Sequence, residues 1–378
     1  MTRRPRPLRL AALAAAAVAL LAACSSGSTS SGAATTGADS SAGASSGGSA
    51  APSSPASAAS TSADELVGTG TGGIVVYNAQ HEDLTQAWAD EFTKETGIAV
   101  EMRNGSDNEL ANQIVAEGSG SPADVFLTEN SPGMNIVEQA GLFAPVDPAT
   151  TAAVPSQFNP STGNWVGIAA RSTVFVYNTD QLKEADLPKS IMDLQDPAWQ
   201  GRWAASAGGA DFQAIVSAIL ELEGSAATSA WLDAMKTNAK IYKGNNTVMK
   251  AVNAGEIPGG VIYHYYWYGD QAKTGENSDK TKLLFWGDQD PGAFLSVSGG
   301  GVLASSTKQQ QAQQFLKFIT SKVGQQVVAD TVLEYPVGSD VPANPALKPI
   351  TQLQPPTIDP ASLNGPEVAD LMTQAGLI

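Results

Sequence analysis

The run Val166-Gly-Ile-Ala-Ala-Arg-Ser-Thr-Val-Phe-Val-Tyr177 decides the fold, because it is a long apolar strand placed between two stretches of alternating strands and helices. Arg171 is its only charged residue, and nothing in it reads as a break. A strand of this length reaches from one lobe of a protein into another. We therefore predict two α/β lobes that are joined through this run.

The hundred residues before this run alternate between strands and helices. Gly97 is expected to end the first helix, in which Leu84, Ala87, Trp88 and Phe92 share one face. The predicted strands are Ile74–Tyr77, Ile98–Met102 and Asp124–Thr128, and the predicted helices are 82–96 and Glu109–Glu117. This rhythm is typical of a parallel sheet.

A second rhythm follows the run. Its predicted elements are a helix at 211–222, a short strand at Ile241–Tyr242, a helix at Thr247–Ala254, a strand at Gly260–Tyr263, a second crossing strand at Ala293–Val302 and an amphipathic helix at Gln309–Thr320. Two α/β lobes with at least two crossing strands make a clamshell that closes by a hinge. We assign 71–169 and 297–346 to the first lobe, and 170–296 and 347–378 to the second.

The N-terminus predicts export and a lipid anchor. Four arginines precede a thirteen-residue apolar stretch at 10–22, which is too short to span a bilayer and is typical of a signal peptide at 1–23. Leu21-Ala-Ala-Cys24 resembles a lipobox, so Cys24 is the predicted lipidation site. Cys24 is the only cysteine, which excludes a disulfide framework within the chain. Residues 24–70, rich in Ser, Gly and Ala, are expected to form a flexible tether.

The charge balance argues against nucleic acid as a partner. The net charge is −16, and it becomes −20 when residues 1–23, with four arginines and no acid, are removed. Such an acidic chain does not suit a phosphate backbone or a polybasic membrane contact. It is compatible with a cationic ligand.

The run Tyr263-His264-Tyr265-Tyr266-Trp267-Tyr268 crowds four phenols and an imidazole into six residues. Val261 and Ile262 before it read as a buried strand, and Gly269-Asp270 after it read as a stop. Ligands of α/β proteins commonly bind at strand ends. A phenol with a pKa near ~10 ionises at neutral pH only beside a strong cation, so two adjacent tyrosines suit a hard metal ion.

With these residues in view, the chain resembles the ferric-iron-binding proteins of bacterial ABC importers, a bacterial transferrin-like group with the type II periplasmic-binding-protein fold. The matching segments cover nearly all of 74–340 in family order; they are Tyr77–Glu82, Ser121–Asn130, Arg171–Asn178, Tyr265–Trp267 and Asp290–Ala293. The resemblance implies a lipid-anchored, extracytoplasmic, non-enzymatic and monomeric protein. It would capture ferric ion between its lobes and deliver it to the transmembrane subunits of an ABC permease.

The resemblance also implies metal ligands: a histidine after the first strand, a glutamate after the third and two consecutive tyrosines. These positions are His81, Glu129, Tyr265 and Tyr266. His81 and Glu129 each follow a predicted strand of one sheet, whereas the tyrosines come from the other lobe, so closure would assemble the site. Both tyrosines can ligate only if their strand has already turned, because strand neighbours point to opposite faces.

Relatives complete the coordination with a small anion, such as phosphate, carbonate or citrate. The matching cradle here is the turn Gly208-Gly209-Ala210 at a helix start, together with Asn245. A serine of the family pattern is Gly208 here, and an asparagine before the tyrosines is Tyr263, which leaves the anion open. Tyr263 and His264 could ligate or lie behind the ligands, and Arg171 could pair with an acid or face the anion.

Two other functions remain open from the sequence. The same fold binds organic solutes such as thiamine, polyamines, sulfate or sugars, on which Trp267 and Tyr268 could stack. A penicillin-recognising serine enzyme is suggested by three short motifs, Ser106-Asp-Asn108, Lys273-Thr-Gly275 and Ser305-Ser-Thr-Lys308. However, the S-x-x-K motif stands last here and first in those enzymes.

Overall fold

The computed structural model describes residues 72–338 and 341–378, so the predicted signal peptide, Cys24 and the tether at 24–70 lie outside the described residues. The described strands form one ten-stranded sheet in the order β2-β1-β3-β10-β5-β8-β6-β7, with β4 beside β10 and β9 beside β5. The strands are β1 (Ile74–Asn78), β2 (Val100–Asn104), β3 (Val125–Leu127), β4 (Phe143–Ala144), β5 (Val166–Asn178), β6 (Trp203–Ala205), β7 (Ala239–Ile241), β8 (Gly259–Tyr263), β9 (Thr281–Leu284) and β10 (Leu295–Leu303).

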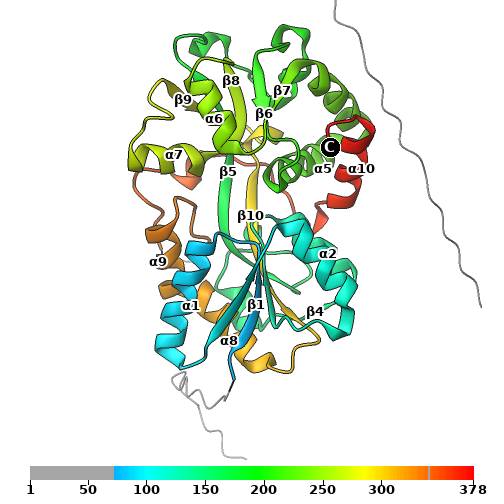
Figure 1. Cartoon of the computed structure of the whole chain (residues 1–378), viewed down its shortest axis with the longest axis vertical. Helices are drawn as coiled ribbons and strands as arrows, with labels where there is room; N and C mark the ends of the chain where they lie inside the picture. The colour runs from blue at the N-terminus through cyan, green and yellow to red at the C-terminus, as the bar shows by residue number, and fades with distance from the viewer. Residues whose placement is uncertain (1–71, 339–340) are drawn as a thin grey trace, which may run out of the picture. The chain divides into compact units, whose positions relative to one another are not determined.

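Two lobes divide the elements, as Figure 1 shows. We call lobe 1 the part built on β1–β4, and lobe 2 the part built on β6–β9. The helices of lobe 1 are α1 (Glu82–Thr96), α2 (Asp107–Glu117), α3 (Ser131–Gln139), α4 (Pro148–Ala152), α8 (Gln309–Thr320) and α9 (Lys322–Thr331). The helices of lobe 2 are α5 (Ala210–Asn238), α6 (Asn245–Asn253), α7 (His264–Lys273) and α10 (Gly365–Gln374), which packs on α5.

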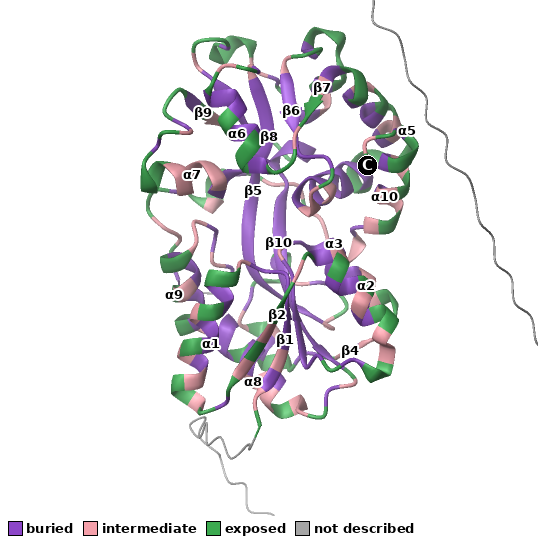
Figure 2. Ribbon diagram, in the orientation of Figure 1, coloured by how far each residue is buried: buried purple, intermediate pink, exposed green. Residues whose placement is uncertain are grey.

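The antiparallel pair β5 and β10 carries the sheet from one lobe into the other. β5 continues into lobe 2 by pairing with β8 and β9, and β10 continues into lobe 1 by pairing with β3 and β4. Every residue of both strands is buried (Figure 2). The predicted two-lobed fold with crossing strands is therefore confirmed.

Local sequence explains several of these elements. The helix predicted at 82–96 has the same bounds as α1, and it ends where Gly97 adopts φ 73° and donates its N–H to Thr93 O. Trp88 of this helix is fully buried, which contributes roughly 1.5–3 kcal/mol as for other large apolar side chains. Lobe 1 packs tightly against β10, since a Cβ on Gly299 would lie 2.3 Å from Met134 Cγ.

Two helices differ from the predictions. α5 has the bounds Ala210–Asn238, but Gly224, at φ 81° and ψ 165°, is not helical and separates two helical segments, so the helix predicted at 211–222 corresponds to the first of them. The stop predicted at Gly269-Asp270 is wrong, because α7 continues to Lys273. A single glycine lowers helix stability by only about 1 kcal/mol, so α7 can continue through Gly269.

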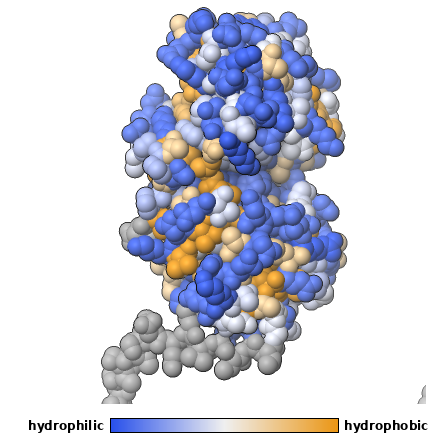
Figure 3. Space-filling model, turned by 60° about the vertical axis from the view of Figure 1, so that its left-hand side comes forward, coloured by the Kyte–Doolittle hydropathy of each residue, from blue (hydrophilic) through white to orange (hydrophobic). Residues whose placement is uncertain are grey.

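The surface is largely hydrophilic on the face seen in Figure 3, and its largest apolar area lies near the waist and on lobe 1. The exposed large hydrophobic residues of the described chain are scattered over five elements or their ends: Val115, Leu222, Ile241, Val323 and Ile378. Among the described residues, no helix combines the length and the apolar character that a membrane crossing needs.

Candidate metal centre between the lobes

Lobe 1 contributes His81 and Glu129 from the carboxyl ends of two paired parallel strands. His81 lies between β1 and α1, at the N-cap position of the helix, and its side chain caps no backbone N–H. Glu129 lies between β3 and α3. Because β1 and β3 are neighbours in the sheet, the two side chains meet, with His81 Nδ1 3.1 Å from Glu129 Oε1.

Lobe 2 contributes the two tyrosines from the first turn of α7. β8 ends at Tyr263, so the strand has turned before Tyr265 and Tyr266, as their predicted joint role requires. Their ring centroids lie 4.1 Å apart, and the Tyr265 ring lies 5.1 Å from the His81 ring across the lobes. The four residues predicted as metal ligands are thus brought together at one place.

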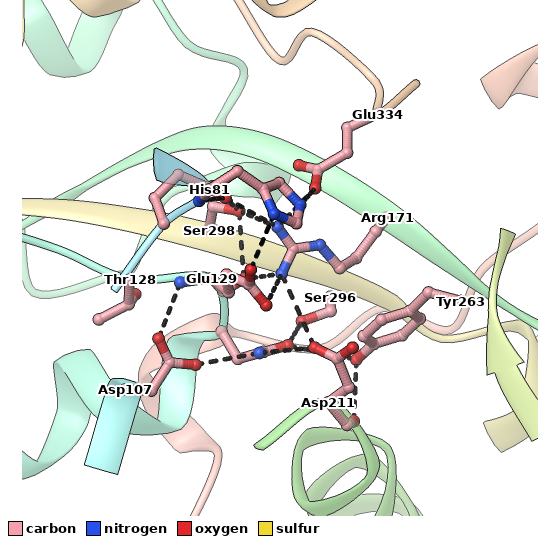
Figure 4. A network of polar contacts seen from close by, with 12 residues as sticks. His81, Asp107, Thr128, Glu129, Arg171, Asp211, Tyr263, Ser296, Ser298 and Glu334 are labelled. Atoms are coloured by element: carbon pink, nitrogen blue, oxygen red, sulfur yellow. Dashed lines mark hydrogen bonds and ion pairs between the residues drawn. The ribbon is translucent and has the colours of Figure 1, made fainter. Parts of the chain in front are cut away.

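A buried polar network surrounds these residues (Figure 4). His81 Nε2 lies 2.8 Å from Oε1 of Glu334, a fully buried residue that the sequence analysis did not single out. Asp107, also missed, accepts the Glu129 N–H at 2.8 Å and the Asn130 side-chain amide at 3.0 Å. Both acids hold residues of the predicted site by hydrogen bonds: Glu334 holds the His81 side chain, and Asp107 holds the Glu129 backbone.

Arg171 is the cation at the centre of the network, and it comes from the crossing strand β5. Its guanidinium donates to Glu129 O at 2.6 Å and to Glu334 Oε1 at 2.8 Å, and it lies 4.0 Å from Asp211 Oδ1. Of the two roles left open for Arg171, pairing with acids is the one seen. Its side chain is fully buried, so these contacts are strongly constrained.

One residue of the predicted anion cradle, Asn245, binds a carboxylate of the chain itself. Gly208 and Gly209 precede α5, Ala210 begins it, and Asn245 begins α6. Asp211, in the first turn of α5, accepts hydrogen bonds from Asn245 Nδ2 at 2.8 Å, Tyr266 OH at 2.9 Å and Asn130 Nδ2 at 3.1 Å. The Asn130 bond also joins lobe 1 to lobe 2.

The two residues before the tyrosine pair take different places. Tyr263 OH lies 3.2 Å from Asp211 O and 3.4 Å from Asn130 Oδ1, so it borders the site. His264 is fully buried, accepts the Ser172 N–H at its Nδ1 and stacks on Tyr335. Burial lowers the pKa of His264 to about 3, which keeps this imidazole neutral.

The charged groups of the site alter one another's protonation. Burial disfavours the charged imidazole of His81, but the hydrogen bond and charge of Glu334, with the charge of Glu129, raise its pKa to about 9. Burial acts against the ionised Glu334 as well, yet Arg171 and His81 lower the pKa of this carboxyl to about 2. Burial raises the pKa of Asp107 to about 7.

Both phenols favour their protonated form in the absence of a metal ion, although the Arg171 guanidinium carbon lies 5.6 Å from the centroid of the Tyr265 ring. Burial, followed by the charge of Asp211, raises the pKa of Tyr265 well above its usual value, and it acts on Tyr266 in the same direction. The Tyr265 hydroxyl is buried and has no hydrogen-bond partner in the described residues. Buried hydroxyls without a partner are rare, and a bound water or ion is one way in which such a group is satisfied.

The described residues contain no group of three or more His, Cys, Asp and Glu side chains arranged to hold a metal ion. The predicted ligand set differs from such a group because it includes two phenols. The donors that converge here are two phenols, one imidazole and the carboxylates of Glu129 and Asp211, mostly hard oxygen atoms.

The residues 120–361 match the family model described as bacterial extracellular solute-binding protein. This match covers more than half of the chain. The chain belongs to this family of solute-binding proteins. Over 307 residues, 81% of this chain and 91% of the relative, it is 62% identical to a protein of Serratia marcescens named Fe(3+)-binding periplasmic protein.

Solved structures also resemble this solute-binding protein. The structure of iron-bound HitA from Pseudomonas aeruginosa is 41% identical and superposes with a TM-score of 0.77, covering 81% of this chain and all of that one. A Trichodesmium protein in complex with iron and citrate is 26% identical with a TM-score of 0.72, again over 81% of this chain and all of that one. The predicted family is confirmed.

The alternative functions find less support in the solute-binding protein's structure. The Trp267 indole N–H donates to Thr281 within lobe 2, and Trp267 packs with residues around α6 rather than with His81 or Glu129. The three serine-enzyme motifs lie at the start of α2, at the end of α7 and between β10 and α8. In the described part of the chain, no hydrogen bond or ion pair joins one of these motifs to another.

Proposed function

We propose that this solute-binding protein captures ferric ion between its lobes and delivers it to the permease of an ABC importer. The observation that carries the proposal is Tyr265, whose buried hydroxyl has no partner among the residues that the structure describes, while its ring contacts the His81 ring edge to face. The iron-binding names of the Serratia and Pseudomonas relatives support the same cargo. As a carrier it needs no catalytic group, and we propose that it is not an enzyme.

The proposed ligands are His81, Glu129, Tyr265 and Tyr266. Fe(III) is a hard ion that favours anionic oxygen, and one carboxylate with two phenolates offsets its three positive charges. A bound cation would lower the pKa of both phenols and stabilise the phenolates, because its positive charge takes the place of the phenolic protons. Lobe closure brings His81 to Tyr265, so binding and closure are one event.

We further propose that the Asp211 carboxylate fills the cradle in which relatives hold a small anion. A cavity of about 320 Å³ lies here, lined by Ser106, Gly209 and Gly244, which are the N-cap residues of α2, α5 and α6. Helix N-termini favour negative charge. Acidic side chains of the chain already lie at two of these N-termini, because Asp107 and Asp211 are in the first turns of α2 and α5.

The variant Asp211→Ala distinguishes a cradle filled by the Asp211 carboxylate from a cradle that binds an exogenous anion. With iron supplied as its nitrilotriacetate complex in chloride buffer, we expect wild type to bind without phosphate, carbonate or citrate. Asp211→Ala should lose at least about tenfold in affinity and recover part of it when phosphate is added. Iron binding by wild type that depends on one of those anions would instead support the exogenous anion predicted from the relatives.

A visible titration tests the proposed cargo. We expect metal-free protein to develop a broad phenolate-to-iron band as ferric citrate is added, saturating at one iron per chain, with a rise in melting temperature. An organic solute would give no such colour. If neither the band nor the melting temperature changes, the ferric proposal is wrong and organic solutes become the first candidates.

The remaining proposals concern place and partners. We propose that cleavage before Cys24 and lipidation of its thiol anchor the protein outside the cytoplasmic membrane, with 24–70 as the tether. We propose that the lobe boundaries lie at 169/170, 296/297 and 346/347. The carrier is proposed to act as a monomer that meets the transmembrane subunits of its permease.

A further inference from the structure

We propose that Glu334 is a positioning residue of the ferric site, one that orients His81 toward the metal without touching the metal itself. This proposal rests on the proposed function. Glu334 follows α9 and precedes Tyr335, far from the sequence segments that supply the ligands. It reaches His81 because its backbone is fixed next to the crossing strand.

The backbone of Glu334 is held in place by the residue after it. Tyr335 exchanges two hydrogen bonds with Ala170 of β5, N to O at 2.8 Å and O to N at 2.9 Å. Ala170 is the neighbour of Arg171 in that strand. Glu334 therefore stands beside the Arg171 guanidinium in the part of the sheet that connects the lobes.

The carboxylate of Glu334 is held through one of its oxygens, because Oε2 has no hydrogen-bond partner in the described residues. It is fully buried, and its Oε1 lies 2.8 Å from both Arg171 Nη2 and His81 Nε2. Arg171 is in turn held by Glu129 O and by Ser298 Oγ at 3.0 Å. Each of these bonds limits the movement of the oxygen that His81 contacts.

This contact determines which imidazole nitrogen is free for a metal. A ring N–H that donates to a carboxylate leaves the opposite nitrogen as the ligand, and such outer partners fix both ring orientation and tautomer. In His81 the opposite nitrogen, Nδ1, faces Glu129 at 3.1 Å. The bond to Glu334 thus turns the ligating nitrogen toward the carboxylate with which it would share the ion.

If Glu334 only neutralised Arg171, its effect on iron affinity would not depend on His81. A double-mutant cycle separates this role from the positioning of His81. We expect Glu334→Ala to weaken iron binding by about 10- to 100-fold in the wild-type background. In a His81→Ala background the same change should cost less than about threefold, because its effect acts through the imidazole. Equal losses in both backgrounds would overturn the proposal.

Two further variants keep this test sharp. Glu334→Gln retains an oxygen acceptor for the His81 N–H, so it should bind iron more tightly than Glu334→Ala does and should fold even if Glu334→Ala does not. A matched control is Glu138→Ala, which removes a lobe 1 carboxylate that accepts from Asn164 and Trp165. Glu138→Ala should leave the iron affinity unchanged both in the wild-type background and in the His81→Ala background.

An NMR measurement without metal distinguishes failure of this proposal from failure of the proposed function. The chain has two histidines, so the imidazole N–H signals are few and His81→Ala assigns them. We expect a slowly exchanging Nε2–H of His81 in wild type and its loss in Glu334→Ala. A rapidly exchanging wild-type signal would overturn the proposal. A slow signal in a protein that shows no iron band would overturn the ferric function, and with it any role of Glu334 at a metal.

Discussion

Replacing Tyr265 and Tyr266 together by phenylalanine is expected to abolish the visible iron band and to reduce iron affinity by more than about 100-fold, beyond what the loss of an outer partner costs. The two phenolates supply two of the negative charges that the ion needs. Tyr265→Phe alone should leave the fold intact, because its hydroxyl has no hydrogen-bond partner to lose in the described residues. Absorbance and competition with citrate measure both effects.

Tyr263→Phe is the matched control for this pair. Tyr263 is buried like Tyr265, but its hydroxyl contacts Asp211 O and Asn130 Oδ1. We expect this variant to keep the band and most of the affinity. A double variant of Tyr265 and Tyr266 that stays coloured would show that the phenolates of another site hold the iron.

Iron affinity is expected to fall steeply as the pH is lowered. In the metal-free protein the pKa values of both tyrosines lie above their usual range, and that of His81 is raised to about 9, so all three carry a proton at pH 7. Iron must displace these protons, and the loaded protein therefore binds fewer protons than the free one. By linkage the affinity rises with pH and is lost toward acid.

The size of this effect follows from the number of protons displaced. If at least two protons leave per ion, a drop of two pH units lowers the affinity by roughly 10⁴-fold. Competition against a chelator, corrected for the chelator's own protonation, measures the slope between pH 5.5 and 7.5. A flat profile would contradict phenolate ligation, whereas a slope reduced by one in His81→Ala would assign one of the protons to that residue.

The fold was predictable where the sequence pattern is local and periodic. The bounds of α1 follow from its apolar face and from Gly97, and the crossing role of β5 follows from its unbroken apolar run. The second segment of α5 beyond Gly224 and the helix α7 were not predicted, and Gly269-Asp270 was read as a stop. The local pattern does not show that α7 continues beyond Gly269.

The site was predictable as far as its residues belong to segments with a recognisable pattern. The structure brings His81, Glu129, Tyr265 and Tyr266 together, although the ligand role of each stays a prediction. Glu334 was missed because its partners lie 163 and 253 residues away. One signal could have found it: an acid inside the apolar stretch Val332–Val337 needs a buried partner.

The continuous sheet through β5 and β10 has a mechanical consequence for the release of cargo. Where the lobes separate, the sheet narrows to a ribbon of these two strands with the single bridge at Tyr335, and two-stranded ribbons are the sheets that twist most readily. Such a ribbon can change its twist while the backbone hydrogen bonds between its two strands are kept. We therefore expect the open and closed forms of the scaffold to have nearly equal free energies. The bound ligand and the contact with the permease would then determine which form is populated.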